Sequence, residues 1–342
     1  MAVSYGHHTH RPMRLGDHRQ VRAITLPPVR YDATAERPAW AELPAFVREA
    51  IEERLGAPVA DITPAGAGFT RGFAATVGGV FVKATDIDYL VDAYRREALV
   101  AEFLPEGVPA ARPRWTIEVR DWYVLALDAL DGHVPALPWE PVELHAVLDA
   151  WAETARLLTR TPEWVWDFSD LARAELTGWQ EIHAHRAPLP AMPRYARAHL
   201  AELAALERAL PELAAGYEGL MHTDLRLDNV LVAGARAWLC DWNHACRGPA
   251  WFDTATLLVT AYASGLDADT LFAGHPTAAG APGDALDAAL AAASGLWLSR
   301  ADRRSEASRS LGDHRRWSGS VALSWLAERR GWPVLDPPVQ TW

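Results

Sequence analysis

The residues whose types and spacing best suit chemistry lie between positions 222 and 241. Asp224 and Asn229 are five positions apart in the segment HTDLRLDN, and Asp241 follows at the end of the next apolar run. A carboxylate can accept a hydroxyl proton, and carboxylate and amide oxygens are ligands for Mg²⁺ on nucleotide phosphates. The set therefore predicts phosphoryl transfer. The alternative is a capped turn in which Asp224 bonds only to nearby backbone amides.

A single lysine is the second feature that suggests chemistry. Lys83 is one of 33 lysine and arginine residues, and every other one is arginine. A GC-rich genome favours arginine codons. A solvated charge tolerates that exchange, but a site that needs a compact ammonium does not accept a planar guanidinium. Lys83 ends the run VFVK behind Gly66, Gly68 and Gly72, so we expect an amine that faces phosphates. The alternative is that it is the last lysine left by chance.

The first half of the chain has the pattern of a small sheet that carries one helix. An amphipathic helix over residues 40–55 comes first. Strands with glycines at their joints follow, then a helix over 89–104, then two more strands. The expected strands are 59–62, 72–77, 80–83, 114–118 and 122–127.

The second half is mostly helical. From Pro141 onward, runs of Ala, Leu, Trp and Arg recur at helical spacing and are broken by proline-rich joints. One strand pair, 229–232 and 237–242, interrupts them directly after Asp224. The order of elements predicts an α+β protein with two lobes.

The first 38 residues differ from both halves. They combine arginines, histidines and prolines with little apolar periodicity, so we expect a flexible or loosely docked extension. A metal-binding cluster of His7, His8, His10 and His18 is the alternative.

Residues 222–229, together with Asp241-Trp242, resemble the catalytic loop of the aminoglycoside phosphotransferase and choline kinase family. That family shares its fold with the protein kinases, and the resemblance covers roughly residues 55–335. It implies a two-lobed protein-kinase-like fold with a small antiparallel-sheet N-lobe carrying one helix and a larger, mostly helical C-lobe. The expected division is 1–38 for the extension, 39–128 for the N-lobe and 129–342 for the C-lobe.

The resemblance also implies roles in the C-lobe. Asp224 would be the catalytic base, and Asn229 and Asp241 would be the metal ligands. Arg226 could place a cation near the transferred phosphoryl group, or it could form a surface salt bridge. His222 would hold the backbone of the loop, Asp228 would be solvated or structural, and Asp253 would support the loop from below.

In the N-lobe the resemblance assigns the nucleotide. Lys83 would bind the α- and β-phosphates, and Glu97 would be its ion-pair partner, with Glu102 as a rival and an exposed Glu97 as the alternative. The glycine segment would cover the phosphates through Gly66, Gly68 and the Thr70 hydroxyl. It is not a Walker loop, because no Gly-Lys-Ser or Gly-Lys-Thr follows it. Adenine would dock near Leu125 and Leu127 through backbone groups.

Composition narrows the class of protein. A net charge of -11 argues against a nucleic-acid binder. No window reaches the roughly 18 apolar residues of a membrane span, and the N-terminus lacks a secretory pattern, so we expect a cytoplasmic protein. We expect a monomer or a homodimer, and the sequence does not decide between them. Cys240 and Cys246 are expected to be small buried residues. Asp241-Trp242-Asn243 lacks the Phe-Gly switch of protein kinases.

The expected activity is transfer of the γ-phosphoryl of ATP or GTP, with Mg²⁺, to a hydroxyl of a small molecule, and an antibiotic is the favoured acceptor. The alternatives are a metabolic sugar or amino-alcohol kinase and a nucleotide-binding module without turnover. The chain has 16 tryptophans, mostly expected in the core, of which one or two could stack on the acceptor. Four acidic residues could meet a cationic acceptor or could lie on solvated helix faces: Asp167, Asp170, Glu175 and Glu181.

Overall fold

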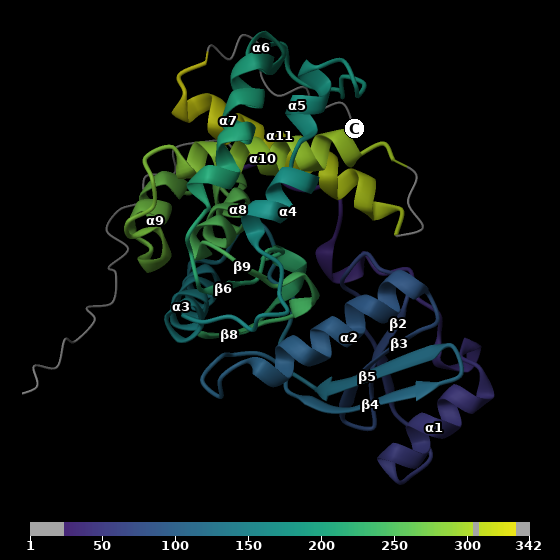
Figure 1. Cartoon of the computed structure of the whole chain (residues 1–342). Helices are drawn as coiled ribbons and strands as arrows, with labels where there is room; N and C mark the ends of the chain where they lie inside the picture. The colour runs from purple at the N-terminus through teal and green to yellow at the C-terminus, as the bar shows by residue number, and fades with distance from the viewer. Residues whose placement is uncertain (1–23, 304–307, 333–342) are drawn as a thin grey trace, which may run out of the picture.

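The computed structural model describes residues 24–303 and 308–332 and has two lobes (Figure 1). The first lobe is a sheet with a helix on each side, and the second is a stack of helices. No helix within these residues is both long enough and apolar enough to cross a membrane. The α+β, two-lobed architecture predicted from the sequence is confirmed.

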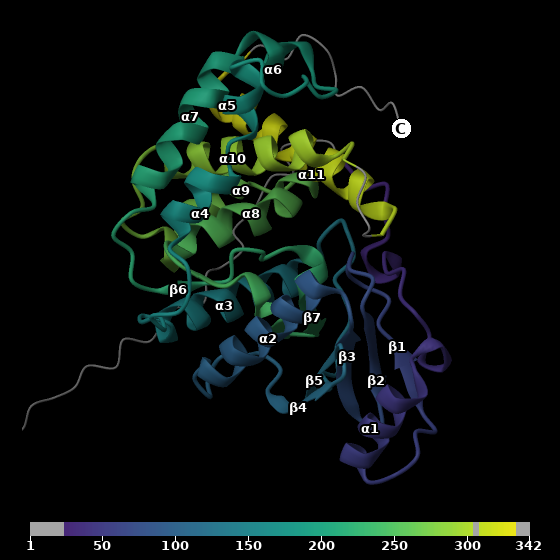
Figure 2. The ribbon, with the colours of Figure 1, turned by 45° about the vertical axis from the view of Figure 1, so that its right-hand side comes forward.

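The sheet of the first lobe has five antiparallel strands in the order β1-β2-β3-β5-β4. Helix α1 (Ala45–Leu55) covers its outer face, and α2 (Asp88–Phe103) lies between the sheet and the second lobe (Figures 1 and 2). The strands are β1 (Ile62–Pro64), β2 (Phe73–Val77), β3 (Val80–Thr85), β4 (Pro113–Val119) and β5 (Trp122–Asp128).

The alternation of side chains along β3 decides which residues face α2. Successive residues of a strand point to opposite faces of the sheet. Val82 and Ala84 pack in the cluster on the α1 side, whereas Phe81 packs with Tyr94 of α2. Lys83 therefore lies on the face that α2 covers, which is the face toward the second lobe.

Two elements of this lobe differ at their ends from the sequence prediction. The helix expected from residue 40 begins only at Ala45, after Pro44, and Trp40–Glu42 form a separate 3-10 turn. The strand expected at 59–62 lies at Ile62–Pro64 instead. It is an edge strand, where a proline without an N–H can be accommodated.

The second lobe is built around α10, which is buried along most of its length. Its small strand pairs are β6 (Leu220–Met221) with β9 (Cys246–Arg247) and β7 (Val230–Ala233) with β8 (Arg236–Leu239). The helices are α3 (Pro141–Leu157), α4 (Phe168–Glu175), α5 (Gly178–His183), α6 (Arg194–Ala198), α7 (Leu200–Leu213), α8 (Ala250–Ala263), α9 (Ala268–Gly274), α10 (Ala285–Arg300) and α11 (Ser310–Arg329).

Tryptophans fill much of the core of this lobe, as the sequence predicted. Trp151, Trp179 and Trp325 are fully buried, and each indole N–H has a partner. The acceptors are Thr254 Oγ1 at 3.0 Å, the Ala291 carbonyl at 2.9 Å and Asp269 Oδ2 at 3.0 Å. These partners remove the cost of burying a polar N–H.

The segment before α1 is docked, which corrects the expectation of a loose extension for its described part, residues 24–38. Tyr31 is buried, and its hydroxyl shares a hydrogen bond of 2.7 Å with His314 Nδ1 of α11. The backbone N–H of Thr25 donates to the Ala263 carbonyl at 2.8 Å. Figure 2 shows this purple segment passing between α11 and the sheet. The histidines of the suggested metal cluster lie outside the described residues.

Glu207 of α7 caps the N-terminus of a different helix, α5. Its two carboxylate oxygens accept the backbone N–H groups of Trp179 at 3.1 Å and Gln180 at 2.8 Å. These N–H groups have no partner inside the helix. Burial raises the pKa of Glu207 to about 7, although the two N–H groups oppose the rise.

We expect Glu207→Gln to change how stability depends on pH. Because the folded-state pKa is above the unfolded value, the stability from this group is complete at acidic pH and is lost as pH rises toward 7. Wild type should therefore lose stability relative to the variant by up to about 1.4 kcal/mol per pH unit between about pH 4.5 and 7. Urea unfolding followed by tryptophan fluorescence measures this. If the difference in free energy of unfolding between wild type and Glu207→Gln stayed constant with pH, the pKa of Glu207 would not be raised. The two N–H groups would then keep its carboxylate ionised in the folded protein.

Candidate active site

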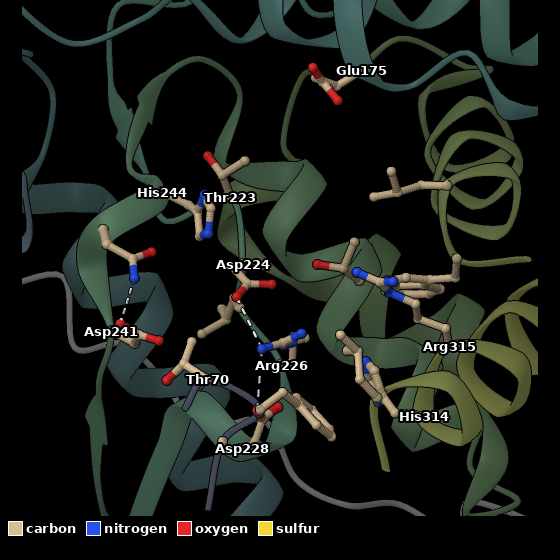
Figure 3. A pocket seen from close by; sticks show the side chains of 18 of the residues that line it. Thr70, Glu175, Thr223, Asp224, Arg226, Asp228, Asp241, His244, His314 and Arg315 are labelled. Carbon is tan, nitrogen blue, oxygen red and sulfur yellow. Dashed lines mark hydrogen bonds and ion pairs between the residues drawn. The ribbon is translucent and has the colours of Figure 1, made fainter. Parts of the chain in front are cut away.

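A cavity of about 630 Å³ lies between the lobes. Its walls come from β3 and α2 of the first lobe, from residues 223–228, and from α4, α10 and α11 of the second lobe (Figure 3). Lys83 lines it together with Asp224 and Asp241, both of which are more than a hundred residues away from Lys83 in the sequence. The fold therefore brings the predicted chemical residues to one place.

The loop after β6 is held from below by buried side chains. The backbone N–H of His222 donates to Asp253 Oδ2 at 2.8 Å, and the His222 ring donates from Nε2 to the Cys240 carbonyl at 2.9 Å. Burial lowers the pKa of His222, so its ring is neutral. Burial also raises the pKa of Asp253 to about 8. Both residues contact the loop backbone, as expected, and neither lines the cavity.

Two residues of the cavity have left-handed backbone conformations. Thr223 has φ 70° and Asp241 has φ 65°. This region is disfavoured for residues with a Cβ, most strongly for a β-branched one such as Thr223. Strain of this kind persists only where the surroundings enforce it, and it clusters at functional sites. Here it orients the two segments that carry Asp224 and Asp241.

Asp224 is positioned by an amide and a guanidinium. Asn229 Nδ2 donates to Asp224 Oδ2 at 2.9 Å and to the Asp224 carbonyl at 2.8 Å. Arg226 Nη2 lies 3.2 Å from Asp224 Oδ2 and 3.2 Å from Asp228 Oδ2. Arg226 is thus in the cavity and not in a surface salt bridge. Asp228 is buried, not solvated, and burial raises its pKa to about 6.

Lys83 joins the two lobes through its ammonium group. Its Nζ lies 2.7 Å from Glu97 Oε2 and 3.0 Å from Asp241 Oδ1. Burial alone would raise the pKa of Asp241, but the Lys83 ammonium lowers it to about 2. Burial raises the pKa of Glu97, although Lys83 opposes the rise. Glu97, and not Glu102, is therefore the partner of Lys83, because Glu97 forms the ion pair and Glu102 is exposed.

The glycine segment is fastened to the N-terminal residues. Gly66 accepts the Ala35 N–H at 2.9 Å, and a Cβ at Gly66 would collide with the Asp32 carbonyl. Arg37 Nη1 donates to Thr70 Oγ1 at 3.3 Å. Of the predicted residues here, Gly68 and Thr70 line the cavity, and Gly66 does not.

The tip of that segment, Phe69, was missed from the sequence. It is buried, and its ring lies 4.9 Å from His314 and 6.5 Å from Tyr31 between centroids. Arg226 lies over the same ring at 5.5 Å. The spacing of residues in the sequence could not predict these contacts of Phe69, because its partners come from the N-terminal segment and from α11.

Leu125 and Leu127 do not line the cavity. Both are buried against α2 with Tyr94 and Ala98. Their strand, β5, is an interior strand that pairs with β3 and β4 on its two sides. Docking of adenine near Leu125 and Leu127 through backbone groups stays a prediction.

The protein residues fit a magnesium nucleotide better than a metal held by protein alone. Among the described residues, no three His, Cys, Asp or Glu side chains gather closely enough to hold a metal ion. Mg²⁺ commonly takes one or two protein oxygens and completes its shell with phosphates and water. Asp241 lines the cavity and offers such an oxygen. Asn229 does not line the cavity and is bonded through Nδ2 to Asp224, which does.

Comparison with solved structures shows the same fold. Aminoglycoside phosphotransferase APH(4)-Ia, as a thermostable mutant in ternary complex with AMP-PNP and hygromycin B, has a TM-score of 0.57 at 18% identity and covers 84% of this chain and 100% of its own. Choline kinase LicA from Streptococcus pneumoniae has a TM-score of 0.54 at 13% identity and covers 83% and 100%. No curated protein sequence matches significantly.

Comparison with family descriptions gives a more specific result. Residues 61–304, more than half of the chain, match the family described as "Phosphotransferase enzyme family", abbreviated APH. The matched region contains Lys83, Glu97, Asp224, Asn229 and Asp241. With the kinase-like fold and the geometry of the cavity, this match shows that the chain belongs to the APH phosphotransferase family.

Proposed function

We propose that this protein transfers the γ-phosphoryl group of ATP or GTP to a hydroxyl group of a small molecule. The observation that carries the proposal is that two sets of residues meet at one cavity, which Lys83, Asp224 and Asp241 line. Lys83, Glu97 and Asp241 form one connected ion-pair set, and Asp224 with Asn229 forms the other. A nucleotide-binding module without turnover would not need the second set.

Each residue has a role in this proposal. Lys83 binds the α- and β-phosphates and is oriented by Glu97. Asp224 accepts the proton of the acceptor hydroxyl while that oxygen bonds to the γ-phosphorus. The bond from the γ-phosphorus to the bridging oxygen breaks, and the nucleoside diphosphate leaves. Arg226 stabilises the charge that develops on the transferred group.

Asp241 and Asn229 are the residues that would hold Mg²⁺. When bound with the nucleotide, the ion neutralises charge on the phosphate oxygens. Asp241 is held by the Lys83 ammonium at 3.0 Å and by Asn243 Nδ2 at 2.9 Å. These contacts keep the carboxylate ionised and ready to bind a cation.

An antibiotic is the acceptor class that we favour. One structural neighbour is a complex with hygromycin B, which is why we place antibiotics first. Another neighbour is a choline kinase, so a metabolic sugar or amino-alcohol kinase is the second candidate. The remaining features of the cavity discriminate between these classes.

The proposal is tested by phosphotransfer from radiolabelled ATP and GTP. The full chain is incubated with Mg²⁺ and a panel of hydroxyl-bearing antibiotics, sugars and amino alcohols, and mass spectrometry detects the gain of one phosphate. We expect transfer to at least one acceptor, and none when EDTA replaces Mg²⁺. Tight binding of AMP-PNP with no transfer to any member would favour the binding module.

A further inference from the structure

The cavity extends past Asp224 into a chamber that the phosphoryl-transfer residues do not fill. Figure 3 shows Asp241 on one side of Asp224 and Arg315 on the other. Because the nucleotide is assigned to the side of Lys83 and Asp241, an acceptor approaching in line must enter from the side of Arg315. The residues that line that chamber therefore indicate the chemical class of the acceptor.

Arg315 of α11 is a cation in the chamber without a carboxylate partner. Its side chain is half-buried and lines the cavity. It donates from Nη1 to the Arg300 backbone carbonyl at 3.1 Å, and no ion pair of the described residues includes it. A half-buried charge without a counterion is costly unless a ligand supplies one.

The other charges of the chamber are already matched. Arg300 Nη2 lies 2.5 Å from Glu175 Oε2, and Arg226 is shared by Asp224 and Asp228. Burial, together with Arg300 and Arg226, lowers the pKa of Arg315 to about 10. Among residues 24–303 and 308–332, no carboxylate therefore pairs with Arg315.

The acidic residues that could have received a cationic acceptor are likewise occupied. Glu175 is the one of the four that lines the cavity, and it pairs with Arg300. Each of the others pairs with an arginine: Asp167 with Arg247 at 3.2 Å, Asp170 with Arg173 at 2.9 Å and Glu181 with Arg186 at 2.7 Å. A polycation would have to break these pairs to bind.

The remaining walls of the chamber are apolar. Leu171 and Leu176 come from or follow α4, and Leu296 and Trp297 come from α10. Trp297 is half-buried, with its ring centroid 6.3 Å from that of His314 in an edge arrangement. Burial lowers the pKa of His314 well below its usual value, so this ring is neutral. Such a surface suits a flat apolar body.

We propose that the acceptor carries a carboxylate bound by Arg315 and a flat apolar body that packs on Trp297 and Leu296. This inference rests on the proposed function, since it names the acceptor class of the same site. A guanidinium binds a carboxylate through two parallel N–H groups, which would fix the orientation of the hydroxyl toward Asp224. The positive charge of Arg315 disfavours choline-like and aminoglycoside-like cations as acceptors.

Three matched probes test the inference: a hydroxymethyl naphthoic acid, its methyl ester and the corresponding hydroxymethyl naphthylmethylamine. Their affinities for the full chain are measured by calorimetry with saturating AMP-PNP and Mg²⁺. We expect the acid to bind about tenfold or more tightly than the ester, and the amine most weakly. In Arg315→Gln the preference for the acid should vanish, while the affinities for the ester and for AMP-PNP stay unchanged.

Arg316→Gln is the matched control, since Arg316 pairs with Asp302 and Asp313 outside the cavity, each at 2.7 Å. It should keep the preference for the acid. The inference is overturned if the amine binds best, if no probe binds at millimolar concentration, or if Arg315→Gln keeps the preference. Loss of AMP-PNP affinity in Arg315→Gln would also overturn it, by assigning Arg315 to the nucleotide. The proposed function fails separately, when no acceptor of the screen gains phosphate.

Discussion

Replacing Asp224 with asparagine is expected to lower kcat for phosphotransfer by about 10²–10⁴. The amide keeps the size of the side chain, but it cannot accept the hydroxyl proton at neutral pH. Arg226 retains Asp228 as a partner, so the loop should keep its shape. The measurement is steady-state phosphotransfer to an acceptor found in the screen, together with the calorimetric affinity for AMP-PNP, which we expect to stay within about threefold of wild type.

Asp170→Asn is the control for this result, because Asp170 is exposed and pairs with Arg173 away from the cavity. Its kcat should equal that of wild type, since an exposed ion pair contributes about 0–1 kcal/mol and touches no reacting atom. If Asp224→Asn kept full activity, another group would have to accept the proton. An equal loss of AMP-PNP affinity and kcat would instead indicate that Asp224 positions the nucleotide.

Local sequence patterns were sufficient to predict the first lobe. Strand and helix patterns depend on neighbouring residues, so the strand of Lys83 and the helix of Glu97 could be predicted from the sequence. Their pairing, at 2.7 Å in the structure, was implied by the family resemblance and not by these patterns. The errors are at element ends: α1 begins after Pro44 and not at residue 40, and β1 lies at Ile62–Pro64 and not at 59–62.

The contacts of the N-terminal segment could not be predicted in the same way. Tyr31 meets His314 and Phe69, partners far away in the sequence. A segment with little periodicity has no pattern that identifies such partners, and its arginines and prolines resemble those of an unattached tail. The segment is docked by burial of Tyr31 together with backbone hydrogen bonds from Thr25 to Ala263 and from Ala35 to Gly66.

Arg315 illustrates a second limit of sequence reasoning. It lies among several arginines of a chain that uses arginine almost exclusively, so its residue type gave no signal. Arg315 and Arg316 differ in their ion pairs, which the sequence does not reveal. Arg316 has two carboxylate partners, and Arg315 has none among the described residues. Lys83 differs in this respect, because it is the only lysine of the chain and its residue type alone marked it as a candidate.

Lys83→Arg is expected to lower kcat/KM by about 10² or more, although both side chains carry one positive charge. The Lys83 side chain has a low exposed fraction of 12%, and its ammonium lies within 3.0 Å of two carboxylates from different lobes. The wider planar guanidinium would have to displace Glu97, Asp241 or both. Disrupting a buried ion pair costs about 3–5 kcal/mol, which corresponds to a factor of 10² or more. Nucleotide affinity by calorimetry and initial rates of phosphotransfer measure the effect.

The matched control is the reverse substitution, arginine to lysine, at an exposed position. Arg95 lies on the same helix as Glu97 and forms a half-exposed pair with Glu118 at 3.0 Å. Arg95→Lys should leave kcat/KM and nucleotide affinity unchanged, because a solvated charge depends little on the shape of the cation. Wild-type activity in Lys83→Arg would show that charge alone is required at this position. The rarity of lysine in this chain would then have no functional explanation, because an arginine at position 83 would bind the phosphates equally well.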